Sequence, residues 1–173
     1  FVLPAWCDSH THIVFAKSRE EEFTDKLKGM SYADIAARGG GILNSARVLN
    51  ETGEDELFVK AWDRLTEISK LGTGAVEIKS GYGLTVEAEL KMLRVIKKLK
   101  EKSSLSIKAT FLAAHTYPVQ YKENHAVYIN SIINEMLPVI AAETLAAYIA
   151  VLCETGFSSP QEMTTICNAG HAA

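Results

Sequence analysis

Two histidines, His10 and His12, stand one residue apart in the mostly apolar stretch 2–15. This composition predicts a β-strand, in which alternate residues point to the same face about 6.6 Å apart. Two imidazoles at that separation can bind one metal ion, for which zinc and iron are candidates. Asp8 shares their face, whereas Cys7 lies on the other, which disfavours a Cys–His zinc finger. The alternative, two histidines hydrogen-bonded inside a core strand, is less favoured by this pattern.

A catalytic zinc ion usually has at least three protein ligands, so two histidines do not complete a site. Three further histidines are present in the chain. His115 follows the apolar segment 106–114, at the strand end where barrel enzymes keep their active sites. His125 and His171 lie in polar surroundings near helix ends, and we expect both to be solvated.

Other polar residues follow the predicted strands. Tyr82 lies in a glycine-rich turn, where its hydroxyl can face a site, although such turns need no function. Arg19, just beyond the first strand, can bind a carboxylate through its guanidinium group. Glu77 and Lys79 alternate with apolar residues and predict an inward ion pair. The glycines at 39–41 either stop a helix or bind an anion.

The elements that must position these residues alternate regularly along the chain. Strands are predicted at 1–15, 75–79, 106–113 and 148–153, with helices at 31–38, 54–71, 86–100, 126–141 and from Ser159 onward. Pro138 predicts a kink, and Ser159 with Glu162 predicts a capping box. This alternation indicates parallel βαβ units, either in an open doubly wound sheet or in a barrel. Four such units are half of a (β/α)8 TIM barrel.

The length and composition suit one globular domain, or a piece of one, spanning residues 1–173. The chain has 18 Lys and Arg against 21 Asp and Glu, and 47% of its residues are hydrophobic. The formal charge of −3, with no basic patch, disfavours nucleic acid as a partner. No apolar stretch approaches the roughly 20 residues of a membrane helix. Three scattered cysteines predict a reducing compartment, most simply the cytoplasm.

The motif at residues 8–12 resembles the first-strand metal motif of the amidohydrolase superfamily. The chain as a whole is similar to the imidazolonepropionases of histidine degradation. The matching stretches cover most of it: 10–16, 18–20, 31–32, 34–36, 39–43, 76–84, 89–93 and 110–115. The resemblance implies the first four βα units of a metal-dependent hydrolase barrel.

The resemblance also implies an activity, the hydrolysis of 4-imidazolone-5-propanoate to N-formimino-L-glutamate with one zinc or iron ion per subunit. By analogy, His10 and His12 would be metal ligands and Arg19 would bind the propionate group. Tyr82 and His115 would contact the substrate, with His115 as the catalytic residue that polarises or orients the ring amide. Tyr32 would lie near the substrate, and a homodimer is common among such enzymes.

The resemblance leaves two alternatives. The family's other metal ligands, a His on the fifth strand and an Asp on the eighth, would lie beyond Ala173, so the chain alone is expected to be an inactive barrel fragment. The second alternative is another cyclic amide hydrolase, such as a hydantoin-type enzyme. A carboxylated lysine bridging two metals is disfavoured because 148–153 contains no lysine. Alanines at 147 and 150 replace acidic residues that the family pattern leads us to expect.

Overall fold

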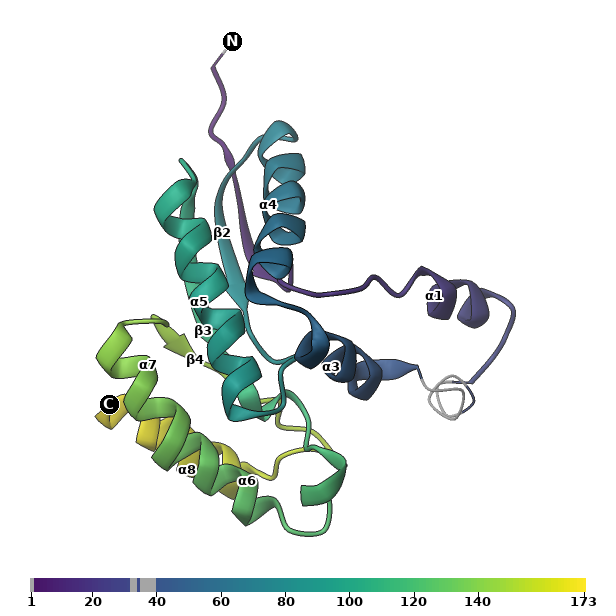
Figure 1. The fold of residues 1–173 in the computed structure, drawn as a ribbon, viewed down its shortest axis with the longest axis vertical. Helices are drawn as coiled ribbons and strands as arrows, with labels where there is room; N and C mark the ends of the chain where they lie inside the picture. Colours follow the sequence, from purple (N-terminus) through teal and green to yellow (C-terminus); the bar gives the residue numbers. More distant parts are fainter. Residues whose placement is uncertain (1, 32–33, 35–39) are drawn as a thin grey trace.

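The chain forms an α/β fold around a four-stranded parallel sheet (Figure 1). The computed structural model describes residues 2–31, 34 and 40–173. The strands are β1 (Trp6–Thr11), β2 (Thr73–Lys79), β3 (Ser106–Phe111) and β4 (Tyr148–Ile149), and they lie in the order β1-β2-β3-β4. All four predicted strands are therefore present. The first and last are shorter than predicted, because only part of each apolar stretch pairs with a neighbour.

Helices connect and cover these strands. The α-helices are α1 (Glu20–Leu27), α3 (Gly41–Glu51), α4 (Glu54–Lys70), α5 (Val86–Lys102), α6 (His125–Ser131), α7 (Leu137–Glu143) and α8 (Pro160–Ala172). Shorter helical turns are η1 (Ala113–His115), η2 (Val119–Tyr121) and the π-helical η3 (Ile132–Met136). The helix predicted at 31–38 lies outside the described residues except for Ser31 and Asp34. Helices α1 and α3 were not predicted.

The core lies between the sheet and the two long helices α4 and α5, which run side by side in Figure 1. Helix α4 buries Leu57, Ala61 and Leu65, the apolar positions that its periodicity predicts. Strand β2 buries Val76 and Ile78 and leaves its alternate residues only partly exposed. Each fully buried aliphatic side chain contributes about 1.5–3 kcal/mol relative to an exposed one, so this contact is a main source of stability.

The helix predicted at 126–141 is continuous but contains one wide turn. Helix α6 passes through the π-helical η3 into α7, which has Pro138 in its first turn. Proline lacks the N–H that an α-helical bond requires, and a wide turn ahead of it accommodates the missing donor. The irregularity of this helix thus lies at 132–136, ahead of the proline, and the kink at Pro138 itself stays a prediction.

The start of α8 agrees with its sequence signal. The Ser159 side chain accepts a hydrogen bond from the Glu162 N–H, and the Glu162 carboxylate accepts one from the Ser159 N–H. Pro160 occupies the first turn, where its missing N–H costs nothing. The predicted capping box is confirmed.

The glycines at 40 and 41 lie at the start of a helix. Gly40 is the N-cap of α3, and the Gly41 N–H donates to Oε1 of Glu22 at 2.9 Å. The bond links α3 to α1, which buries no residue and stands away from the sheet in Figure 1. The backbone at Gly41 thus binds an anion, as one alternative held, but the anion is a side chain of the same molecule. Gly39 lies outside the described residues.

Candidate active site

Three aromatic side chains meet at the carboxyl edge of the parallel sheet. His12 follows β1, Tyr82 follows β2, and His115 follows β3. The His12 ring lies 5.2 Å from that of His115, nearly parallel to it, and 5.1 Å from that of Tyr82. The rings of Tyr82 and His115 are 5.6 Å apart. Parallel strands bring their carboxyl ends to one edge, so residues 103 positions apart in the chain become neighbours.

His10 completes this group from β1. Its ring centroid lies 5.6 Å from that of His12, with the planes tilted by 59°. His10 is exposed, and its backbone N–H donates to the Asp8 carboxylate at 3.3 Å. Within the part of the chain that the structure describes, the buried Nδ1 of His12 has no hydrogen-bond partner. An unsatisfied buried nitrogen beside a second imidazole fits a position where a metal ion would bind.

His12 is held in its neutral form. Burial, with smaller contributions from the nearby His115, His10 and Lys79, lowers the pKa of His12 to about 4, and Glu77 opposes this shift only in part. A neutral imidazole offers a lone pair, whereas an imidazolium does not. The surroundings of His12 therefore suit a ligand or a hydrogen-bond acceptor.

The tautomer of His115 is set by the loop that carries Tyr82. Nδ1 of His115 lies 3.1 Å from the carbonyl oxygen of Gly81. A carbonyl can only accept, so Nδ1 carries the proton and donates it, and Nε2 is the unprotonated nitrogen. Burial lowers the pKa of His115, with smaller contributions in the same direction from His10 and Arg19. Nε2 is thus a neutral acceptor.

Tyr82 presents a neutral phenol. Burial raises the pKa of the Tyr82 hydroxyl, and the charge of Arg19 opposes this effect without cancelling it. The hydroxyl therefore keeps its proton near neutral pH and can donate a hydrogen bond.

Arg19 is already paired with an acidic side chain. It is the N-cap of α1, and its Nε donates to Oε2 of Glu22 at 2.9 Å. Glu22 accepts from Gly41 through its other oxygen, so Arg19 and the start of α3 are linked. The effects on Tyr82 and His115 show that its charge is felt at the ring cluster. Tyr32 lies outside the described residues.

The ion pair predicted on β2 is present. Nζ of Lys79 lies 2.6 Å from Oε1 of Glu77, and both side chains are largely buried, at 13% and 12% exposure. The other carboxylate oxygen of Glu77 has no partner among the described residues. Both charges act on the neighbouring His12: Lys79 lowers its pKa and Glu77 raises it.

Known proteins resemble this chain over nearly its full length. An imidazolonepropionase of Flavobacterium johnsoniae is 63% identical over 169 residues, which are 98% of this chain and 41% of the relative. Those of Christiangramia forsetii and Shewanella putrefaciens are 59% and 43% identical, over 91% and 100% of this chain and 38% and 42% of each relative. The chain belongs to the imidazolonepropionase family. It spans about two fifths of the length of these relatives.

Two further comparisons concern the fold. No protein-family model matches the chain. The crystal structure of an amidohydrolase from Burkholderia ambifaria, described with bound Zn, superposes with a TM-score of 0.57 at 14% identity. It covers 98% of this chain and 50% of that protein. The imidazolonepropionase segment thus shares the fold of a region of an amidohydrolase.

The described residues contain no complete metal site and no membrane helix. Between residues 2–31, at 34 and over 40–173, no three or more His, Cys, Asp or Glu side chains are grouped to hold a metal ion. None of the helices in these ranges is long and apolar enough to cross a membrane.

The expectation for His125 was wrong, and that for His171 is confirmed. The His125 ring stacks on Tyr117 with centroids 3.5 Å apart, and its Nδ1 lies 2.9 Å from Oε1 of Glu162. It therefore joins the start of α6 to the start of α8, because the fold brings two helix ends together that a sequence pattern does not relate. His171 is exposed near the end of α8.

The segment after the histidine pair is held by cations of α4. Arg64 donates to the carbonyl oxygens of Ile13 and Phe15 at 2.9 and 2.8 Å, and Lys60 donates to that of Ala16 at 3.0 Å. The Arg64 guanidinium also lies 3.4 Å from the centre of the Phe15 ring. These contacts fix the backbone beyond β1, where ladder hydrogen bonds have ended.

One buried acidic residue near the site was missed in the sequence. Glu89, in the first turn of α5, is fully buried. It stands four and seven residues before Leu93 and Ile96, which lie on the buried face of the same helix. A carboxylate at an apolar position of a helix was the available signal, and it indicates a specific set of hydrogen-bond donors.

Proposed function

We propose that the protein carrying this chain hydrolyses 4-imidazolone-5-propanoate to N-formimino-L-glutamate, using one zinc or iron ion. The observation that carries this proposal is the convergence of His10, His12, Tyr82 and His115 at the carboxyl edge of the sheet. The relatives named imidazolonepropionase support the choice of substrate.

We propose that the sheet is part of a (β/α)8 barrel. Its strands are parallel and stand in chain order, with no reversal among the described strands. A doubly wound sheet reverses its order at a switch point, whereas a barrel adds each strand beside the preceding one. The likeness to an amidohydrolase over half of that protein's length supports the barrel.

In this proposal, His10 and His12 hold the metal together with ligands from the rest of the protein. The Nδ1 of His12, which lacks a hydrogen-bond partner among the described residues, and the lowered pKa that keeps its ring neutral fit this role. When bound, such an ion lowers the pKa of a water molecule and polarises a carbonyl group. The zinc-bound amidohydrolase with this fold supports a metal of this kind.

The remaining residues bind and orient the substrate. Arg19 carries the positive charge for the propionate carboxylate, and its Nε bond to Glu22 leaves the terminal nitrogens to make that contact. Tyr82 donates through its neutral hydroxyl. His115 accepts through Nε2, because its Nδ1 proton is committed to Gly81. The ring amide is thus oriented between a donor and an acceptor.

The test uses the complete protein that carries this sequence. We expect hydrolysis of 4-imidazolone-5-propanoate, with about one metal ion per chain, and loss of both activity and metal in His10→Ala and His12→Ala. His171→Ala, which changes an exposed histidine, is the matched control and should leave both unchanged. Hydantoin hydrolysis without imidazolone hydrolysis would overturn the proposed substrate. Full metal content in both site variants would overturn the proposed ligands.

A further inference from the structure

Glu89 carries a buried carboxylate that is paired with no cation among the described residues. Its side chain lies beneath the loop between β2 and α5, and no charged group contributes to its environment in the part of the chain described. Burial raises the pKa of Glu89, while hydrogen bonds from Ser80, Leu84, Gly83 and Gly81 act in the opposite direction. An isolated buried carboxylate is costly, so this set of donors is the reason that the fold tolerates one.

Three backbone N–H groups of one loop donate to this carboxylate. Gly83 and Leu84 donate to Oε1 at 2.7 and 3.1 Å, and Gly81 donates to Oε2 at 3.0 Å. The buried Ser80 hydroxyl also bonds to Glu89, and its oxygen accepts from the Leu112 N–H at 3.0 Å. The carboxylate therefore ties the end of β2 to the segment that leads from β3 to His115.

The loop needs this support because its backbone is unusual. Gly81 has φ +107°, and Leu84 has φ 57°, a left-handed conformation that a leucine rarely adopts. A Cβ at Gly83 would lie 2.5 Å from the Glu89 nitrogen, so the loop passes directly against the helix. Such conformations persist only where surrounding contacts hold them.

The same loop positions both substrate-facing groups on this side of the site. Tyr82 lies between two of the residues whose N–H groups Glu89 binds. The Gly81 carbonyl accepts the Nδ1 proton of His115, and a Cβ at Gly81 would lie only 3.0 Å from that nitrogen. A small displacement of Gly81 would therefore move the Tyr82 ring. It would also weaken the hydrogen bond that keeps the His115 proton on Nδ1.

We propose that Glu89 is a positioning residue of this site, whose carboxylate fixes the 80–84 loop so that Tyr82 faces His12 and His115 keeps its proton on Nδ1. The effect on catalysis rests on the proposed function, whereas the effect on His115 does not. An amide cannot replace the carboxylate, because its NH₂ group would face backbone donors at one of the two positions.

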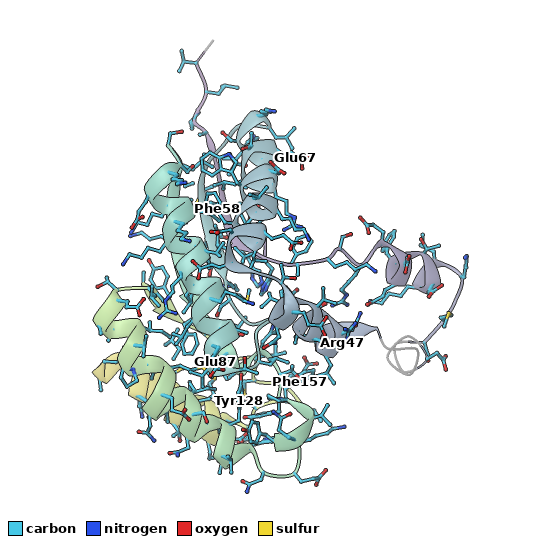
Figure 2. The ribbon with its side chains drawn as sticks, in the orientation of Figure 1. Arg47, Phe58, Glu67, Glu87, Tyr128 and Phe157 are labelled. Carbon is cyan, nitrogen blue, oxygen red and sulfur yellow. The ribbon has the colours of Figure 1, made fainter. Side chains whose placement is uncertain are left out.

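The experiment compares Glu89→Gln with Glu87→Gln in the complete protein. Glu87 lies in the same first turn of α5 but is exposed (Figure 2), so both variants lose one negative charge at one helix end. The tautomer of His115 is read from its ring ¹⁵N shifts at one neutral pH, with assignment from His115→Gln. The variant Leu99→Ala, from the buried far end of α5, controls for a general loss of stability.

We expect Glu89→Gln to move His115 toward a mixture of tautomers and to lower kcat about tenfold or more, with metal content unchanged. Glu87→Gln and Leu99→Ala should keep the original tautomer and lie within about twofold of the unmodified kcat. An unchanged His115 spectrum in folded Glu89→Gln would overturn the proposal, as would an equal change in Leu99→Ala.

Two further results remain decisive. If the unmodified protein does not hydrolyse the imidazolone, the proposed function fails, and the His115 spectra alone still decide the role of Glu89. If Glu89→Gln does not fold, Ser80→Ala replaces it, since this change removes one donor to Glu89 and the acceptor of Leu112. A shift in the His115 spectrum of Ser80→Ala would support the proposal, and an unchanged spectrum would overturn it.

Discussion

Replacing Gly81 by alanine tests how tightly the 80–84 loop is packed. Two effects add at this position. The φ of +107° disfavours any L side chain, at a cost of about 1 kcal/mol. The new Cβ would also lie 2.8 Å from the Leu112 carbonyl oxygen and 3.1 Å from the Cβ of His115. Overpacking of this kind costs about 1–3 kcal/mol, so the free energy of unfolding should fall by about 2–4 kcal/mol.

Gly156→Ala is the matched control. Gly156 has φ +86°, but nothing lies within 4 Å of its added Cβ. The control therefore retains the backbone effect and lacks the steric one, and it should cost only about 1 kcal/mol. The assay is urea unfolding of both variants and the unmodified protein, followed by circular dichroism at one pH. Equal losses in the two variants would show that the loop yields to the new methyl group, and would refute the close packing described for Gly81.

Two other predictions concern the core and the start of α8. Leu93→Ala, at a fully buried position, should lower the free energy of unfolding by about 2–5 kcal/mol. The control Val59→Ala, at an exposed position, should change it by at most about 0.5 kcal/mol. Chemical denaturation of both variants measures these changes. Burial acts to raise the pKa of Glu162, but hydrogen bonds from Ser159 and His125 outweigh it and hold the pKa below its usual range. The carboxylate therefore stabilises the fold above its unfolded pKa, and this contribution disappears as the pH falls through the folded value. Glu162→Gln should cost about 1–3 kcal/mol at neutral pH and progressively less in acid, and a loss that is independent of pH would contradict the assignment.

Periodic and capping signals in the sequence predicted most of the elements that hold the site. The apolar spacing of α4 and α5 and the capping box at Ser159 are local features, and the structure contains all three. Helices α1 and α3 gave weaker signals: α1 buries no residue, and α3 begins at a pair of glycines that also fits a helix end. Local patterns do not separate these alternatives, because the deciding contact joins Glu22 to Gly41 across 19 residues.

For the site as well, local sequence patterns predicted where residues lie along the chain, whereas contacts between distant segments could not be predicted. The strand period predicted a shared face for His10 and His12, and strand ends predicted the positions of Tyr82 and His115. Their ring contacts and the tautomer of His115 depend on how three strand ends meet, which no single segment encodes. His125 was missed because its partner, Glu162, lies 37 residues further along the chain. The partners of Glu89 lie in the loop just before α5, but their N–H groups converge on it through backbone conformations that a periodic pattern does not reveal.

The cations of α4 also bear on how sequences of this kind can vary. Arg64 and Lys60 hold the segment after the histidine pair through main-chain oxygens, which every amino acid supplies. Ile13 and Ala16 can therefore be exchanged for side chains of similar size without loss of these bonds. Arg64 has no such freedom, since one guanidinium serves two carbonyls and stacks on Phe15. Substitutions should thus be accepted at Ile13 and Ala16, after the histidine pair, and selected against at Arg64 of α4.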